Sequence, residues 1–260
     1  MPKVIVVDSS IIFFRSIYSW RVKKDKWNFP NRQYLISLIS CLKEVKVSKD
    51  DIVIIAIDSK KGSWRKEIDV DYKANRKDIR KEQDDIPWTK FFEDYNKLLN
   101  ILDVATPFHY IDIEKCEADD IIAEACRYYK DKEVIIISSD TDMEQLAAYP
   151  NVRIFSNISH KFKQITNPYK ILSKKLDKEV TDNLLTPILN ELDFEKRNLI
   201  VNLLSLPLEI SLKIRNELDK IVNNKSTNID LIPISIARER FNSIWKKEKV
   251  EVKNDKNGLF

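Results

Sequence analysis

The sequence predicts an α/β fold with a mainly parallel central sheet flanked by helices, followed by a C-terminal helical region. Three short runs of β-branched residues have the pattern of strands buried on both faces, and they lie at 3–7 (KVIVV), 52–57 (IVIIAI) and 134–137 (VIII). Apolar residues at helical spacing predict helices from about residue 11, over 31–44, and from Glu117 onward. These alternating patterns predict residues 1–166 as the α/β core and 167–260 as the helical region.

Composition bounds the class of protein. The 260 residues are 43% hydrophobic, which is ample for a large core, and 45 basic residues nearly balance 41 acidic ones. The net charge of +4 is compatible with a polyanionic partner but does not require one. Three cysteines without metal-ligand spacing predict a reducing compartment, and no apolar run approaches transmembrane length, so we expect a soluble cytoplasmic protein. Only two glycines occur, which excludes glycine-rich phosphate loops.

Acidic residues follow each predicted strand. Any one of them alone would be read as a helix cap or a turn residue. Carboxylates gathered at the carboxyl ends of parallel strands would instead repel one another unless divalent cations lay among them, and oxygen-only ligands favour Mg²⁺ or Mn²⁺. The residues concerned are Asp8, Asp58, Asp140 and Asp142, together with Glu117, Asp119 and Asp120 in the first turn of a helix.

The most basic part of the chain follows Asp58 directly. Residues 60–81 (KKGSWRKEIDVDYKANRKDIRK) hold nine Lys or Arg against four Asp or Glu, with Trp64 and Tyr72 interleaved. Basic side chains mixed with aromatic rings suit a surface that follows a nucleic-acid backbone and stacks on bases. On charge alone a solvated helix face is an equally good reading, and the neighbouring carboxylates favour the nucleic-acid surface.

Several co-linear motifs resemble one family. Asp8 after the first strand, then AIDSKKGSWRKEI, DYKANRKDIRKE, EADDIIA, SSDTDMEQL and YPNVRIFS, are similar in order and spacing to the phage and bacterial 5′ nucleases of the flap endonuclease superfamily, which have a PIN-like core. The likeness runs from about residue 3 to 165, and a weaker one covers 198–218. It implies a metal-dependent 5′→3′ exonuclease or flap endonuclease that hydrolyses DNA, and RNA primers as well, by a two-metal mechanism in phage replication or repair.

The resemblance also implies roles for individual residues. Residues of about 60–86 would form a basic arch over the free 5′ strand, in the cytoplasm of the host if the protein is phage-encoded. Two basic residues of the arch, Lys73 and Arg76, would contact the scissile phosphate as catalytic groups. The implied nucleic-acid contacts are Trp64, Arg65, Tyr72, Lys73, Arg76 and Lys77. The resemblance assigns Asp8, Asp58, Glu117, Asp119 and Asp120 to the first metal site and its immediate shell, and Asp140 and Asp142 to the second.

One motif of the family is missing. Its members carry a glycine-bearing third acidic segment and a helix-hairpin-helix, whereas residues 167–194 contain no glycine, and Asp177 and Asp182 are the only candidate remnants. This departure leaves open a non-catalytic or partner-dependent nucleic-acid-binding protein. A haloacid-dehalogenase-type phosphatase is disfavoured because Ser10 stands where its second Asp belongs, and a PIN-type ribonuclease because it ordinarily lacks the basic insertion.

The expected partners are DNA with a free 5′ end or flap and an RNA·DNA hybrid, with no membrane and no second subunit. The terminal Leu259-Phe260 is a candidate docking peptide for a sliding clamp or single-strand-binding protein, against the default of a frayed end.

Overall fold

The computed structural model describes residues 2–23, 30–177, 188–221, 225, 227–232 and 234–245, apart from the side chains of Lys77, Ile236 and Trp245. A six-stranded sheet lies at the centre, in the order β3-β2-β1-β4-β5-β6. Its strands are parallel except for β6, which pairs antiparallel with β5 at one edge. The strands are β1 (Val4–Asp8), β2 (Ile52–Ile57), β3 (His109–Asp112), β4 (Val134–Ile137), β5 (Val152–Ser156) and β6 (Lys161–Phe162).

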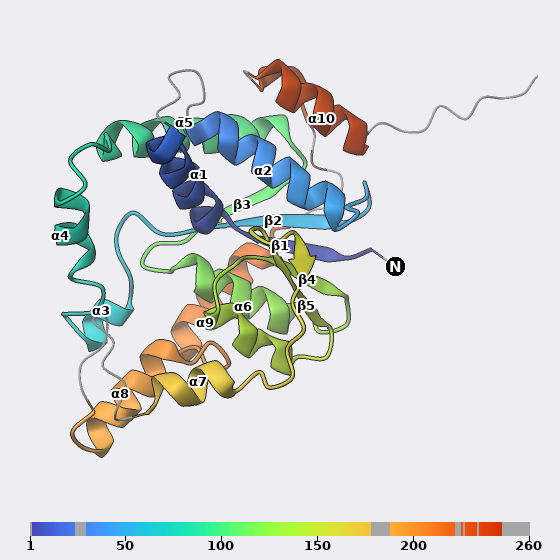
Figure 1. Cartoon of the computed structure of the whole chain (residues 1–260). Helices are drawn as coiled ribbons and strands as arrows, with labels where there is room; N and C mark the ends of the chain where they lie inside the picture. The colour runs from blue at the N-terminus through green and yellow to red at the C-terminus, as the bar shows by residue number, and fades with distance from the viewer. Residues whose placement is uncertain are drawn as a thin grey trace, which may run out of the picture.

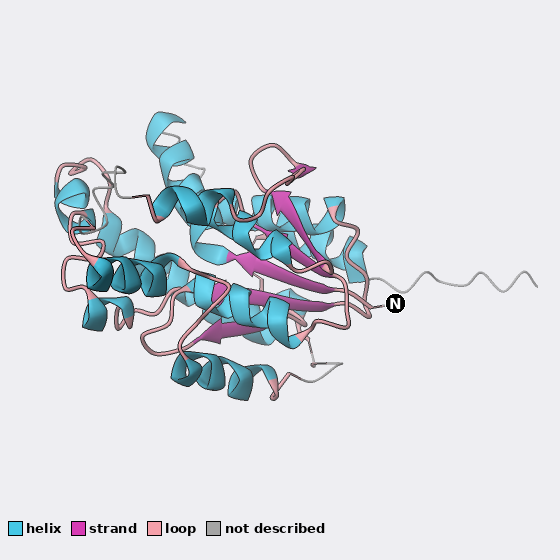
Figure 2. Ribbon diagram, turned by 90° about the horizontal axis from the view of Figure 1, so that it is seen from below, coloured by secondary structure: helices cyan, strands magenta, loops and turns pink. Residues whose placement is uncertain are grey.

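Helices cover both faces of this sheet, so the molecule has three layers (Figure 1). One face carries α1 (Ser9–Lys23), α2 (Pro30–Glu44), α5 (Trp88–Ala105) and α10 (Ser235–Trp245). The other carries α6 (Ala118–Tyr128), α7 (Lys170–Lys175), α8 (Glu191–Val201) and α9 (Leu208–Leu218). Figure 2 shows the strands side by side between these layers. The described part of the chain contains no helix long and apolar enough to cross a membrane.

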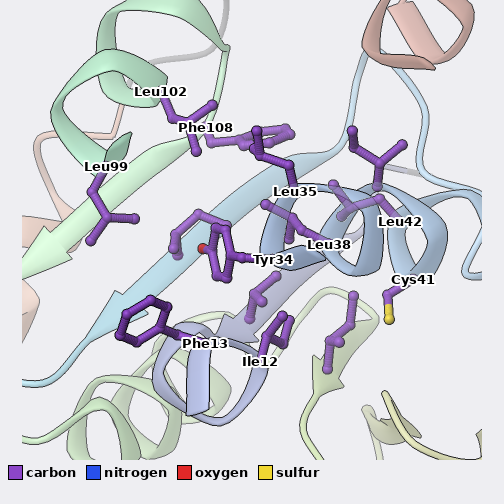
Figure 3. Packing of buried hydrophobic residues seen from close by; sticks show 14 of the residues in the cluster. Ile12, Phe13, Tyr34, Leu35, Leu38, Cys41, Leu42, Leu99, Leu102 and Phe108 are labelled. Carbon is purple, nitrogen blue, oxygen red and sulfur yellow. The ribbon is translucent and has the colours of Figure 1, made fainter. Parts of the chain in front are cut away.

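The predicted strands are buried because their apolar residues face both helical layers. Every residue of β1, β2 and β4 is buried, as expected for parallel strands covered on both faces. Alternate residues divide between two cores: Ile5 and Val7 pack with α1, α2 and α5, whereas Val4 and Val6 pack with α6 and α9. Figure 3 shows the first of these cores, in which Phe13, Tyr34 and Leu38 lie against the sheet.

The C-terminal region contributes to both cores. On one face, Ile210 and Ile214 of α9 pack in the cluster that contains α6 and the sheet. On the other, Ala237 and Phe241 of α10 join the cluster with α2. Helices from beyond residue 166 thus complete the cores on both sides of the sheet. The boundary between two regions at residue 166 stays a prediction.

The basic segment forms two short helices, α3 (Arg65–Ile68) and α4 (Arg76–Lys81), joined by turns. In Figure 1, α4 stands at the edge of the molecule and links α3, near the lower helical layer, to α5 in the upper one. The remaining elements are short 3₁₀ segments, η1 (Asp142–Ala148) and η2 (Ile229–Leu231). The segment from α3 to α5 therefore spans both layers beside the carboxyl ends of the strands.

Candidate metal and nucleic-acid site

Carboxylates lie at or just after the ends of three neighbouring strands, at one edge of the sheet. Asp8 ends β1, Asp58 directly follows β2, and Asp140 lies three residues beyond β4. Because β1 pairs in parallel with both β2 and β4, these three strand ends lie at the same edge. Asp119, in the first turn of α6, joins them as a lining residue of one cavity of about 670 Å³. The sheet topology thus gathers carboxylates that lie far apart in the sequence.

Hydrogen bonds hold these carboxylates in place. Asp8 accepts from the Ser138 hydroxyl at 2.9 Å and from the backbone N–H of Ile11 at 3.2 Å. Asp58 accepts from the Ser10 hydroxyl at 2.6 Å and from the backbone N–H of Ala118 at 2.8 Å. The second bond of Asp58 ties the end of β2 to the start of α6.

The same carboxylates carry negative charge that the protein does not neutralise. Burial, together with the charges of Asp58 and Asp140, raises the pKa of Asp8 to about 7. Burial also raises the pKa of Asp119, and Asp8 is the largest charge that adds to this effect. Within the described part of the chain, the ion pairs made by the cations of this cavity go to other acids, Glu117, Asp120 and Asp142. A cation bound among the four carboxylates would remove this repulsion.

The donor set fits a hydrated, hard divalent ion. Among the described residues, no three acidic, histidine or cysteine side chains stand close enough together to enclose a metal. Mg²⁺ does not need such a cage, because it keeps several waters and takes only one or two carboxylates directly. Oxygen ligands with unneutralised charge are therefore suited to a hydrated divalent cation that takes one or two of Asp8, Asp58, Asp119 and Asp140 directly.

Asp120 lies in a different environment from its neighbour Asp119. It is fully buried and is not among the residues that line the cavity. Its two oxygens accept from the Arg65 guanidinium at 2.7 and 3.0 Å, and one also accepts from the Trp64 indole at 3.0 Å. The same carboxylate caps α6 by accepting from the backbone N–H of Glu117 at 2.9 Å. Asp120 is therefore saturated by protein donors, so its place in the predicted metal site is that of a supporting residue behind Asp119.

The predicted nucleic-acid contacts occupy two kinds of position. Trp64, Arg65 and Tyr72 are only 5%, 2% and 7% exposed, although Arg65 and Tyr72 still line the cavity. Arg65 is buried because its Nε donates to the backbone carbonyl of Ile200, at 2.7 Å, and the rest of its guanidinium binds carboxylates. Arg76, by contrast, is exposed and lines the cavity. The side chain of Lys77 lies outside the described part of the structure.

Lys73 reaches the cavity from an unusual backbone conformation. Its φ of 56° lies in the left-handed region, which non-glycine residues seldom adopt. Its Nζ pairs with Glu117 at 2.7 Å, and the Tyr72 hydroxyl donates to the other oxygen of that carboxylate at 3.0 Å. Although burial lowers the pKa of Lys73, Glu117 holds it above its usual value. Lys73 is thus a permanently charged ammonium held beside the four carboxylates.

Sequence reasoning missed other residues of the cavity. Lys175, at the end of α7, pairs with Asp142 and lines the cavity. Arg80 lies over the rings of Phe14 and Trp88, with its guanidinium carbon 5.7 Å from each ring centroid. The basic and aromatic composition of residues 60–81 signalled Arg80, whereas no local pattern singled out Lys175. Asp177, a candidate for the third acidic motif, does not line the cavity, and Asp182 lies outside the described residues.

A mainly parallel α/β sheet, with carboxylates at the ends of three adjacent strands and a basic segment across them, is an arrangement that can bind divalent cations and a phosphodiester together. The chain belongs to the family described as 5′-3′ exonuclease, N-terminal resolvase-like domain, whose model matches residues 3–176. The resemblance to 5′ nucleases found in the sequence is thereby confirmed.

Individual relatives agree with this family. The chain is 34% identical over 147 residues to the ribonuclease H of Enterobacteria phage T4, covering 55% of this chain and 48% of that protein. It is 28% identical over 146 residues to a 5′-3′ exonuclease of Mycoplasmopsis pulmonis (strain UAB CTIP), covering 55% of this chain and 45% of that protein. The chain therefore spans about half the length of these relatives. These phage and bacterial relatives agree with the resemblance to phage and bacterial 5′ nucleases found in the sequence.

Solved structures show the fold. The D15 protein of T5, co-crystallised with metal ions, superposes with a TM-score of 0.59 at 16% identity, covering 93% of this chain and 99% of that one. A single-substitution variant of the bacteriophage T5 D15 flap endonuclease, in complex with DNA and metal ions, gives a TM-score of 0.57 at 15% identity, covering 93% of this chain and 97% of that one. The predicted PIN-like α/β fold is confirmed.

Proposed function

We propose that this protein is a divalent-metal-dependent 5′ nuclease that hydrolyses phosphodiester bonds of DNA at free 5′ ends or flaps. The observation that carries the proposal is one cavity in which four carboxylates that make no ion pair with any described residue lie together with the basic groups Lys73, Arg76 and Arg80. A metal ion and a phosphodiester together complement this arrangement, because the metal satisfies the carboxylates and the phosphate satisfies the basic groups. Family membership supports the same reaction class.

In this proposal Asp8, Asp58, Asp119 and Asp140 hold Mg²⁺ or Mn²⁺. When bound, the ion supplies Lewis-acid stabilisation of the phosphate and lowers the pKa of a water molecule. The protein contributes the positions of the carboxylates, and Ser138 and Ser10 fix those of Asp8 and Asp58 through their hydroxyls. The ions in the T5 relative are consistent with a divalent metal.

Lys73 and Arg76 act on the substrate phosphate. Lys73 is held at the cavity by Glu117, so its ammonium is already placed and little conformational freedom is lost when a phosphate enters. Arg76 is exposed at the same cavity and provides a planar, bidentate donor for phosphate oxygens. In this proposal the largely buried Arg65 and Tyr72 form part of the cavity wall, and together with Trp64 and Asp120 they position the start of α6.

Substrate class follows from the relatives. One is described as a flap endonuclease in complex with DNA, and another carries the name ribonuclease H, so DNA flaps and RNA·DNA primers are both proposed substrates. Binding to a sliding clamp or single-strand-binding protein, the monomeric state and a cytoplasmic location stay predictions.

The test is cleavage of a substrate panel by the purified chain. We would compare 5′-flap, nicked-duplex, blunt-duplex, single-stranded and RNA·DNA substrates, each with Mg²⁺, with Mn²⁺ and with a chelator. Cutting of flaps or free 5′ ends only in the presence of metal is expected. Binding without cutting under every condition would refute the nuclease and favour a partner-dependent binding protein, in line with the missing third acidic motif.

A further inference from the structure

Asp142 differs from the other carboxylates of the cavity because it already has a cation. Its Oδ2 lies 2.5 Å from the Nζ of Lys175, and both side chains line the cavity. About a quarter of each side chain is exposed, so the pair lies at the wall of the cavity and not in the core. Asp142 was one of the two residues predicted to hold a second metal ion.

Packing holds Lys175 at this position. Lys175 is the last residue of α7, which lies against η1, the element that begins with Asp142. Leu172 and Leu176 pack against the cluster of Tyr72, Ile200 and Val201, which fixes the end of α7 beside the cavity. The ammonium therefore approaches Asp142 from a supported element.

The surroundings of Asp142 do not fit a second divalent ion. Among the described residues, the carboxylates that line the cavity from the loop after β4 are Asp140 and Asp142. Asp177 does not line the cavity. A divalent ion bound to Asp142 would lie within a few ångströms of the Lys175 ammonium, and like charges at that separation repel strongly at the effective dielectric constant of a protein surface. Asp8 and Asp119, in contrast, make no ion pair among the described residues, and their mutual repulsion, which outweighs the nearby charge of Lys73 at Asp119, favours a bound cation.

We propose that the ammonium of Lys175 takes the place of a second metal ion, so that the site holds one tightly bound divalent ion and one fixed lysine charge. The inference rests on the proposed function, because it assumes the metal at Asp8, Asp58, Asp119 and Asp140. Lys175 donates one of its three ammonium N–H groups to Asp142, which leaves a point charge and up to two donors for a phosphate in the cavity. It neutralises Asp142 without a contribution from Asp177, which does not line the cavity, or from Asp182, which lies outside the described residues.

The experiment counts Mn²⁺ ions per chain by electron paramagnetic resonance, in the full-length protein, with and without a 5′-phosphorylated single-stranded oligonucleotide. The variants are Lys175→Ala, Lys175→Arg and Lys174→Ala. Lys174 is the matched control because it is the adjacent lysine of α7 and is exposed. Circular dichroism melting confirms that each variant is folded.

The wild-type protein, Lys175→Arg and Lys174→Ala are expected to bind one tight Mn²⁺. Lys175→Ala is expected to bind a second ion at least about tenfold more tightly than the wild type does, because Asp142 is released and the repelling charge is gone. The concentration dependence of cleavage on Mg²⁺ should then become steeper in Lys175→Ala alone.

Two outcomes overturn the inference by itself: two ions of similar affinity in the wild type with metal-dependent cleavage intact, or a second affinity that Lys175→Ala leaves unchanged or weakens. Absence of any bound Mn²⁺, together with absence of cleavage, would instead refute the proposed function on which the inference rests.

Discussion

Two groups of acids lie on either side of the first turn of α6, and they show how charge compensation separates a binding site from a structural one. In the front group, Asp8, Asp58, Asp119 and Asp140 face a cavity and repel one another. In the rear group, Asp120 is fully buried against the Arg65 guanidinium and the Trp64 indole. Adjacent residues of a helix are rotated by about 100°, so Asp119 and Asp120 serve opposite groups although they are chemically identical.

The largest expected effect comes from removing the charge at each of these two positions. Asp119→Asn should lower the cleavage rate by at least about 10³-fold, because it removes a carboxylate proposed to hold the metal ion that stabilises charge in the transition state. Its melting temperature should stay the same or rise, since a repelling charge is lost. Asp120→Asn should instead lower the free energy of unfolding by about 3–5 kcal/mol, because it leaves Arg65 buried without its main counter-charge.

Cleavage assays under single-turnover conditions and urea unfolding would measure the two effects separately. The comparison fails if both variants lose activity at unchanged stability, since Asp120 would then behave as a ligand.

Lys73 sharpens the description of the front group. Lys73→Ala should lower the cleavage rate constant by about 10²-fold while changing substrate affinity by no more than about threefold, because binding loses one cation of several and the reacting phosphate loses its placed charge. Single-turnover rates over a range of enzyme concentrations separate the cleavage rate constant from the substrate affinity. Lys81→Ala is the control, because Lys81 belongs to the same basic segment but pairs at the surface with Asp78. A pure affinity defect would assign Lys73 to the binding surface alone.

Arg65 tests the rear group. Arg65→Lys should lower the free energy of unfolding by about 2 kcal/mol, because an ammonium cannot reproduce the planar fork that binds Asp120, Glu117 and the Ile200 carbonyl together. Denaturant unfolding measures the loss. Unchanged stability would mean that the ammonium of a lysine can replace the hydrogen bonds of the Arg65 guanidinium.

The smallest effect concerns the metal-free protein. Asp8→Asn should raise stability in chelator by on the order of 1 kcal/mol at pH 8, because the ionised carboxylate is the disfavoured form in the folded state. The raised pKa gives the sign: the folded state binds the extra proton, so the penalty is present above about pH 7 and disappears as the pH falls toward the unfolded value of 3.8. Thermal melts of both proteins at pH 5 and 8 measure it. A gain that is equal at both pH values would exclude the charge as its cause.

Much of the front group was predictable from local patterns. β2 and β4 match the predicted boundaries, and the helix predicted over 31–44 is observed from Pro30 to Glu44. Acids at the ends of parallel strands lie together because parallel pairing aligns the strand ends, so Asp8, Asp58 and Asp140 were predictable as one group. The helix α5 and the edge strand β3 were not predicted.

The rear group was not predictable in this way. Trp64, Arg65 and Tyr72 lie in a segment whose composition indicates an exposed basic surface, yet all three are buried. Arg65 donates to the backbone of Ile200 at the end of α8, 135 residues later in the sequence, and Tyr72 packs against Ile200 and Val201. Lys175 was missed for the same reason, since its partner Asp142 lies 33 residues earlier.

The sequence by itself determined the sheet, the family and the carboxylates at its edge, because these follow from periodicities and motifs within short windows. The tertiary structure decided which acids remain without a cation and which are neutralised by Arg65, Lys73 or Lys175. The physical reason is that Coulomb and desolvation energies depend on distances between side chains, and those distances are set only when α7 and α8 pack against the first turn of α6 and the loop after β4.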